Sequence, residues 1–101
     1  MDWAEDHIKR LQAGETVTFR PRGRSMEPLV MDNQEVTVEP VSVGPHVRLE
    51  VGDIVLCRVG RRSYLHLVKR CNQSTLQYQI GNNKGRVNGW VRAEDIFGRM
   101  V

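Results

Sequence analysis

The segment from Ile54 to Lys69 constrains the fold most strongly, because it has the pattern of a β-hairpin. Ile54–Val59 is a run of apolar and β-branched residues, and Tyr64–Lys69 has a similar character. Between them, Gly60-Arg61-Arg62 supplies a short turn that contains glycine. Two such runs joined by a tight turn are typical of neighbouring antiparallel strands. The centre of the chain is therefore predicted to be β structure.

Apolar residues alternate with polar residues in several other segments, as in Val17–Phe19 and Val36–Val38. Further strands are predicted at Val17–Phe19, Val36–Val38, Leu76–Ile80, Trp90–Val91 and Ile96–Val101. Only Asp2–Ala13 has apolar residues at helical spacing, and Gly14 is suited to end that helix. We therefore predict a mostly β, single compact domain. It would comprise a short N-terminal helix within residues 1–14 and a β domain of twisted antiparallel sheets over residues 15–101.

Length and cysteine content narrow the class of protein. A chain of 101 residues has room for one compact domain. No apolar run approaches the ~20 residues of a membrane-spanning helix, and the acidic N-terminus lacks the basic start of a signal peptide. Cys57 and Cys71 are far apart and show no metal-binding spacing. We expect reduced thiols, a cytoplasmic location, no metal and no cofactor.

The charge of the chain argues against a dedicated nucleic-acid binder. The formal net charge is +3, and the arginines are spread along the sequence instead of forming one dense cluster. A role in nucleic-acid binding would require five arginines to share one face: Arg20, Arg22, Arg24, Arg61 and Arg62.

One segment stands out as a candidate for a catalytic residue: Gly23-Arg24-Ser25-Met26-Glu27-Pro28. A serine in a tight turn that begins with glycine can present its hydroxyl group while backbone N–H groups converge beside it. That arrangement suits a nucleophile, but the hydroxyl needs a base to take its proton. The spacing of acidic residues, histidines and serines singles out no catalytic triad. A lysine with a lowered pKa is another known base for such a serine.

Lys69 is the candidate for that base. Strand alternation places it on the same face as Leu65 and Leu67, and a lysine on an apolar face is unusual. Burial would favour its neutral amine, which can accept a proton. In the alternative interpretation, Lys69 lies at the end of the strand and extends its ammonium group to water. The residue pattern leaves both interpretations open.

Four segments, in order, resemble the sequence boxes of the signal peptidase I and LexA-like superfamily. The serine turn resembles its nucleophile box, Gly-x-Ser-Met-x-Pro or a close variant. Gly52-Asp53-Ile54-Val55 resembles its Gly-Asp-Ile-Val strand, and Leu67-Val68-Lys69-Arg70 resembles the segment that holds its general base. Gly81-Asn82-Asn83 and the strands after it are similar to the late Gly-Asp-Asn box and the closing strands. The resemblance covers residues 17–101.

The resemblance implies a fold and two catalytic roles. The fold would be the β domain of that superfamily. Ser25 would attack the carbonyl group of the substrate, and Lys69 would serve as general base and then as acid. The backbone N–H of Ser25 would be one donor to the oxyanion, and a second donor would come from Gly23 or Arg24.

The resemblance also implies that residues near Ser25 and in the late box hold the site in position. Met26 would pack beneath the nucleophile, and Pro28 would fix the chain that leaves it. The late box would steady the site through Gly81, Asn82 and Asn83. Two departures from the family pattern stand out. Asn82 occupies a position that usually holds aspartate, and the serine or threonine that often orients the lysine has no clear counterpart except Asn83 or Asn88.

His66 is the alternative base. Some relatives use a histidine that is followed by arginine, but here Leu67 follows His66 whereas Arg70 follows Lys69. The sequence therefore favours Lys69. In a regular strand the side chains of His66 and Lys69 point to opposite faces, so only one of them could serve. A β-bulge between them would remove that argument.

The chain is therefore predicted to be a serine endopeptidase-like protein that uses a Ser/Lys dyad on a protein or peptide substrate bound in extended form. Signal peptidases carry a membrane anchor and LexA-like repressors carry a DNA-binding domain, so neither full role is expected. The alternative is a catalytically inactive peptide- or protein-binding module of the same fold. The helix at Asp2–Ala13 would cover a face of the sheet or form a homodimer contact.

Overall fold

The central feature of the fold is the predicted hairpin, as seen in a computed structural model that describes residues 2–101. Strand β3 (Ile54–Val59) pairs antiparallel with β4 (Arg62–Asn72). Because Val59 pairs with Arg62, the turn consists of Gly60 and Arg61 alone. Gly60 has a φ of 63°, a conformation that glycine adopts without strain. The hairpin prediction is confirmed, with Arg62 belonging to the strand instead of the turn.

The other predicted elements are present with small changes at their ends. Five further strands are formed: β1 (Val17–Phe19), β2 (Val36–Pro40), β5 (Gln77–Gly81), β6 (Val87–Arg92) and β7 (Ile96–Met100). The helix α1 (Glu5–Gln12) is shorter than predicted, and a short 3-10 helix, η1 (Ala93–Asp95), precedes β7. Gly14 ends α1 as expected, with a φ of 87° and an N–H that donates to the carbonyl of Leu11. Within residues 2–101, no helix has the length and apolar character needed to cross a membrane.

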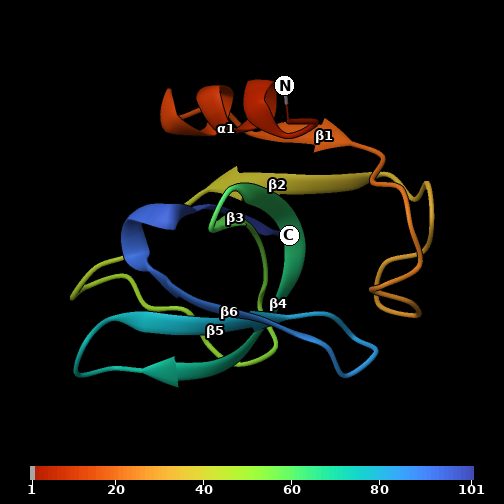
Figure 1. The fold of residues 1–101 in the computed structure, drawn as a ribbon. Helices are drawn as coiled ribbons and strands as arrows, with labels where there is room; N and C mark the ends of the chain where they lie inside the picture. Colours follow the sequence, from red (N-terminus) through yellow and green to blue (C-terminus); the bar gives the residue numbers. More distant parts are fainter. Residues whose placement is uncertain (1) are drawn as a thin grey trace.

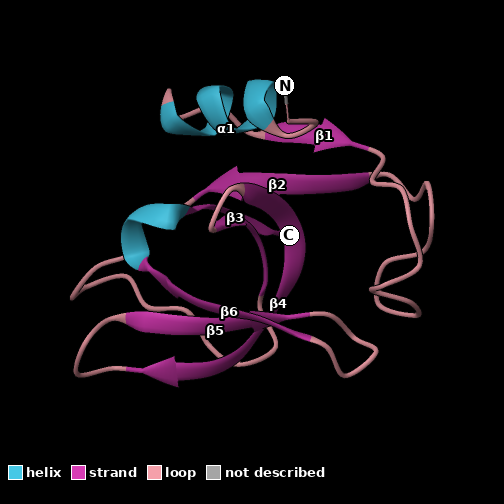
Figure 2. Ribbon diagram, viewed as in Figure 1, coloured by secondary structure: helices cyan, strands magenta, loops and turns pink. Residues whose placement is uncertain are grey.

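The seven strands form one antiparallel sheet in the order β1-β2-β7-β3-β4-β5-β6. This confirms the mostly β class, but the sheet is continuous where several sheets were expected. It is continuous because the C-terminal strand β7 pairs with both β2 and β3. Figures 1 and 2 show α1, β1 and β2 on one side and β5 and β6 on the other, with β3 and β4 curving between them.

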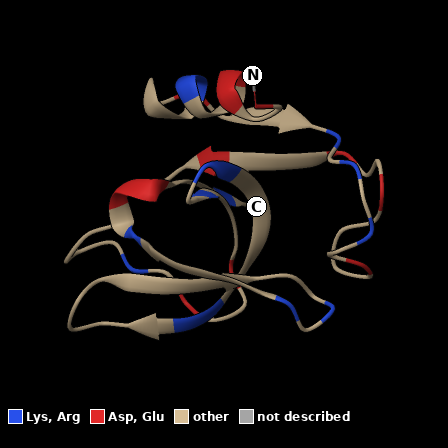
Figure 3. Cartoon of the chain, in the orientation of Figure 1, with Lys and Arg blue, Asp and Glu red and all other residues tan. Residues whose placement is uncertain are grey.

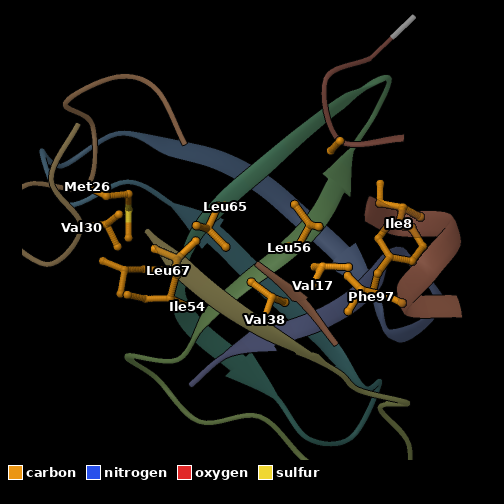
Figure 4. Close-up of a cluster of buried hydrophobic side chains, with 13 residues drawn as sticks. Ile8, Val17, Met26, Val30, Val38, Ile54, Leu56, Leu65, Leu67 and Phe97 are labelled. Carbon is orange, nitrogen blue, oxygen red and sulfur yellow. The ribbon is translucent and has the colours of Figure 1, made fainter. Parts of the chain in front are cut away.

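The curved sheet packs two hydrophobic cores. The first extends from Met26 of the serine turn and the nearby Val30 to Ile8 of α1 and Phe97 of β7 (Figure 4). Helix α1 therefore covers a face of the sheet, which is one of the two roles that the sequence suggested for it. The second core lies under β5 and consists of Leu49, Val55, Cys57, Val68, Tyr78, Ile80, Val91 and Ile96.

Two irregularities in the sheet bear on the candidate site. In the pairing of β4 with β5, the register shifts between Val68 and Arg70, so Lys69 is an extra residue. In the pairing of β5 with β6, the residues on either side of Asn88 pair with neighbouring residues of β5, so Asn88 is also an extra residue. Such bulges turn side chains away from the regular alternation of a strand.

Candidate functional site

Ser25 lies in the long loop between β1 and β2, and two hydrogen bonds hold the ends of that loop together. The N–H of Asn33 donates to the carbonyl of Pro21 at 2.8 Å, and the N–H of Gly23 donates to Oδ1 of Asp32 at 2.8 Å. Gly23 has a φ of 110°, in the region that favours glycine. The glycine of the serine turn is thus required by the local backbone, and Ser25 follows it half-buried.

The residues after Ser25 anchor the turn to the first core. Met26 is buried there, and its carbonyl accepts the N–H of Val30 at 3.0 Å. Pro28 lies exposed in the turn that follows. Arg24 is exposed as well, on the other side of Ser25.

Asn83 connects the loop between β5 and β6 to the serine turn. Its backbone N–H donates to the carbonyl of Ser25 at 2.9 Å. Its side-chain Nδ2 donates to the carbonyl of Glu27, also at 2.9 Å. Two bonds from one residue therefore fix the backbone on both sides of Met26. Figure 1 shows these two loops on the same side of the molecule.

Asn82 holds that loop in shape. Its Oδ1 accepts the backbone N–H of Lys84 at 2.8 Å and that of Arg86 at 2.9 Å. The aspartate that usually stands in the late box would offer the same acceptor oxygen. Asparagine at this position therefore makes both hydrogen bonds without carrying a charge.

Replacing Gly81 with alanine should destabilise the fold by about 1–3 kcal/mol, because a Cβ there has no room. It would lie 2.5 Å from the backbone oxygen of Arg86 and 3.0 Å from Cε of Lys69. A denaturant titration of the variant measures the loss. Gly44→Ala is the matched control, since no atom of residues 2–101 lies within 4 Å of a Cβ at Gly44. Equal stability of the two variants would contradict the packing described for Gly81.

Ser25, His66 and Asn88 form a continuous hydrogen-bonded chain. Oγ of Ser25 lies 3.2 Å from Nε2 of His66, and Nδ1 of His66 lies 2.7 Å from Oδ1 of Asn88. The three residues come from the β1–β2 loop, from β4 and from the bulge in β6. His66 is buried, and its ring packs against the ring of Tyr64 with 4.8 Å between their centres.

The amide of Asn88 selects the form of His66 that can act as a base. An amide oxygen only accepts, so Nδ1 of His66 carries the hydrogen. A neutral imidazole has one N–H, so Nε2 then presents its lone pair to the hydroxyl of Ser25. Burial lowers the pKa of His66, the bond to Asn88 raises it and the charge of Arg86 lowers it, with a net shift downward. The ring is therefore neutral at neutral pH.

Lys69 occupies a different place. It is the extra residue of the bulge in β4, and its side chain runs beside Gly81. Among residues 2–101, the hydroxyl of Ser25 bonds to His66 and makes no hydrogen bond to Lys69. Lys69 is also not part of the cleft described below. The structure thus joins Ser25 to the alternative base of the sequence analysis, and the role of Lys69 as base stays a prediction.

The backbone around Ser25 limits the choice of oxyanion donors. The N–H of Gly23 is already bonded to Asp32, so it is not free for a substrate. In the part of the chain that the structure describes, the N–H groups of Ser25 and Arg24 have no hydrogen-bond acceptor. Of the two residues that the resemblance offered for the second donor, Arg24 is the one with a free N–H.

A cleft of about 860 Å³ lies over Ser25 and His66. Its walls include Met26, Asn82 and Asn88 beside the serine, and an aromatic corner of Trp3, His7 and Phe19 at some distance along the cleft. Four arginines border it: Arg20, Arg22, Arg62 and Arg86. Figure 3 shows basic segments on the two loops that meet at this side of the molecule.

Sequence reasoning proposed Asn88 as an orienting residue only in relation to lysine. Its pairing with His66 depends on the bulge in β6, which the sequence analysis did not predict. Gly89, with a φ of 148° next to Asn88, is the one local signal, because glycine within a strand often marks a bulge.

Comparison with models of known protein families finds no match to the chain, and a search of curated proteins finds no match either.

Proposed function

We propose that this chain is a serine hydrolase that cleaves a peptide bond, with Ser25 as nucleophile and His66 as general base. The observation that carries the proposal is the chain of hydrogen bonds from Ser25 through His66 to Asn88. Nucleophile, base and orienting group are the three parts that such chemistry needs. The order of sequence boxes that resemble the signal peptidase I and LexA-like superfamily supports the same reaction and the same finer fold.

The reaction would proceed in two steps. Nε2 of His66 takes the hydroxyl proton as Oγ of Ser25 bonds to the substrate carbonyl carbon, and the N–H groups of Ser25 and Arg24 donate to the oxyanion. The protonated imidazole gives its proton to the leaving amine as the peptide C–N bond breaks. Water then attacks the acyl-Ser25 ester with His66 again as base, which releases the acid and restores the serine.

The residue that orients His66 in this site, Asn88, is uncharged. Its amide oxygen holds the imidazole in the productive form, as an asparagine does in papain-like proteases. It carries no charge, however, and so stabilises the imidazolium less than a carboxylate would. This feature favours the second candidate function, a peptide-binding module that does not cleave.

Hydrolysis assays on the wild-type protein and Ser25→Ala separate the two functions. We expect the wild type to release fragments from unfolded protein or synthetic peptides, and Ser25→Ala to bind the same peptides without releasing any. Binding by both proteins and cleavage by neither would establish the binding module and overturn the hydrolase.

Cleavage should fall as the medium becomes acidic, because the base is a histidine. Protonated His66 cannot accept the serine proton, so activity is lost as pH falls through the pKa of His66. Because burial lowers that pKa, the midpoint of the acid limb should lie below 6.5, the ordinary histidine value. A profile of kcat/KM against pH measures it. A midpoint above 6.5 would contradict a buried neutral imidazole as the base.

Two further proposals concern the setting of the protein. Cys57 and Cys71 are both free thiols, which supports a reducing, cytoplasmic location. Fractionation of the source cells tests it, and recovery from an oxidising compartment would overturn it. The homodimer contact that the sequence suggested for α1 stays a prediction.

A further inference from the structure

Part of β4 has an unpaired edge that faces the cleft. On one side, β4 pairs with β3 from Arg62 to Leu67. On its other side it pairs with β5, but that pairing begins only at Leu67. Among residues 2–101, no strand pairs with this edge of β4 before Leu67, and Arg62 to His66 all border the cleft. The opposite wall of the cleft is formed by the segment that leads from the edge strand β1 to Ser25.

The hydrogen bonds of β4 show which backbone groups point into the cleft. The N–H of Ser63 donates to Oδ2 of Asp2, on the side away from β3. Backbone groups alternate along a strand, so the N–H and carbonyl of Leu65 point the same way as those of Ser63. The pairing of Leu67 with β5 agrees with this direction. Leu65 thus presents one donor and one acceptor beside the Ser25–His66 pair.

The N-terminal segment occupies the far end of this edge. Oδ1 of Asp2 accepts the N–H of Ala4 at 2.8 Å, and Oδ2 accepts the N–H of Ser63 at 3.2 Å. The carboxylate therefore sits where the carbonyl of a paired strand would sit. Trp3 follows it, 51% exposed, with its ring centre 5.7 Å from that of Phe19.

We propose that the cleft takes a short extended peptide segment that pairs with Leu65, and that Asp2 and Trp3 form the closed end of the cleft. The free edge runs from Tyr64 to His66, three residues or about 10 Å, so it accommodates about three residues of the segment. The last of these would carry a large apolar side chain that packs on Trp3 and Phe19. The inference deepens the proposed function and rests on it for the reaction, but not for the binding.

Calorimetric titrations of Ser25→Ala with synthetic peptides test the length limit without turnover. The peptides are alanine-based, blocked at both termini and extended one residue at a time at each end separately. As the peptide is extended toward Asp2, its affinity should rise until about three residues lie along the free edge of β4. Further extension in that direction should leave the affinity unchanged. In the double variant with Asp2→Ala, a further residue should pair with Ser63 and gain about 3- to 10-fold in affinity.

Matched variants separate the carboxylate from the aromatic corner. Asp2→Asn keeps the size of the side chain and one of the two acceptor oxygens, which can still accept the N–H of Ser63, so it should keep the length limit. Trp3→Ala should lose the preference for leucine over alanine at the terminal position of the peptide, whereas Trp90→Ala should keep it, because Trp90 is equally exposed but lies outside the cleft. An unchanged length profile in a folded Asp2→Ala protein would overturn the closed end.

Amide hydrogen exchange tests the same geometry without any change near Asp2, and so covers the case in which Asp2→Ala does not fold. In Ser25→Ala, bound peptide should slow exchange at Leu65, whereas Ser63 should be protected before peptide is added. Unchanged exchange at Leu65 on saturation would overturn the pairing.

If peptides bind with the expected length profile but wild-type protein cleaves none, the hydrolase fails and this inference stands. If wild-type protein cleaves peptides and their length makes no difference to binding, the hydrolase stands and this inference fails.

Discussion

His66→Ala should reduce peptide cleavage by a factor of about 10⁴ or more, because the hydroxyl of Ser25 then has no acceptor for its proton. Lys69→Ala should retain cleavage to within about tenfold, since Lys69 makes no hydrogen bond to Ser25 among residues 2–101. Single-turnover rates with a cleavable peptide measure both effects. His46→Ala is the matched control for the histidine, because His46 is exposed and outside the cleft.

The opposite ranking of these two variants would reverse the assignment. If Lys69→Ala lost cleavage and His66→Ala kept it, the Ser/Lys dyad implied by the family resemblance would be the working pair. His66 would then serve only to pack the cleft wall with Tyr64. Thermal unfolding of each variant shows whether a loss of rate reflects chemistry or loss of the fold.

Leu56→Ala should reduce the free energy of unfolding by about 2–5 kcal/mol. Leu56 is fully buried in the first core, on the central strand β3, and it has neighbouring strands on both sides. Removing its side chain leaves a cavity that the paired strands on either side cannot close. Chemical denaturation followed by circular dichroism gives the difference.

Val101→Ala is the control for that measurement. Val101 is 64% exposed, so its truncation should change the free energy of unfolding by less than about 0.5 kcal/mol. A loss below about 1 kcal/mol at Leu56 would contradict the position of β3 at the centre of the sheet.

The strands and the hairpin were predictable because they depend on local patterns. The apolar and β-branched runs on either side of Gly60 favour two paired antiparallel strands, and the structure has this pairing. Gly14 and the serine turn were predictable for the same reason, since each depends on a backbone conformation that glycine favours. The class of fold follows from these local preferences.

The order of the strands and the partner of Ser25 depend on contacts between distant residues. β7 lies between β2 and β3, a placement that no local pattern specifies. The alternation rule set His66 against Lys69 as candidate bases, but it assumes a regular strand, and the bulge at Lys69 breaks that regularity. A second bulge turns Asn88 toward His66. The sequence analysis therefore offered His66 only as the alternative base, and the geometry of the structure was needed to prefer it to Lys69.

Covalent labelling at Ser25 tests the central claim most directly. The wild-type protein is treated at neutral pH with a serine-reactive phosphonate, and the adduct is located by mass spectrometry of proteolytic fragments. The exposed Ser42 serves as an internal reference for unactivated serine. We predict an adduct on Ser25 and none on Ser42, with labelling of Ser25 lost in His66→Ala. Equal labelling of the two serines, or labelling of Ser25 at the full rate in His66→Ala, would contradict the account.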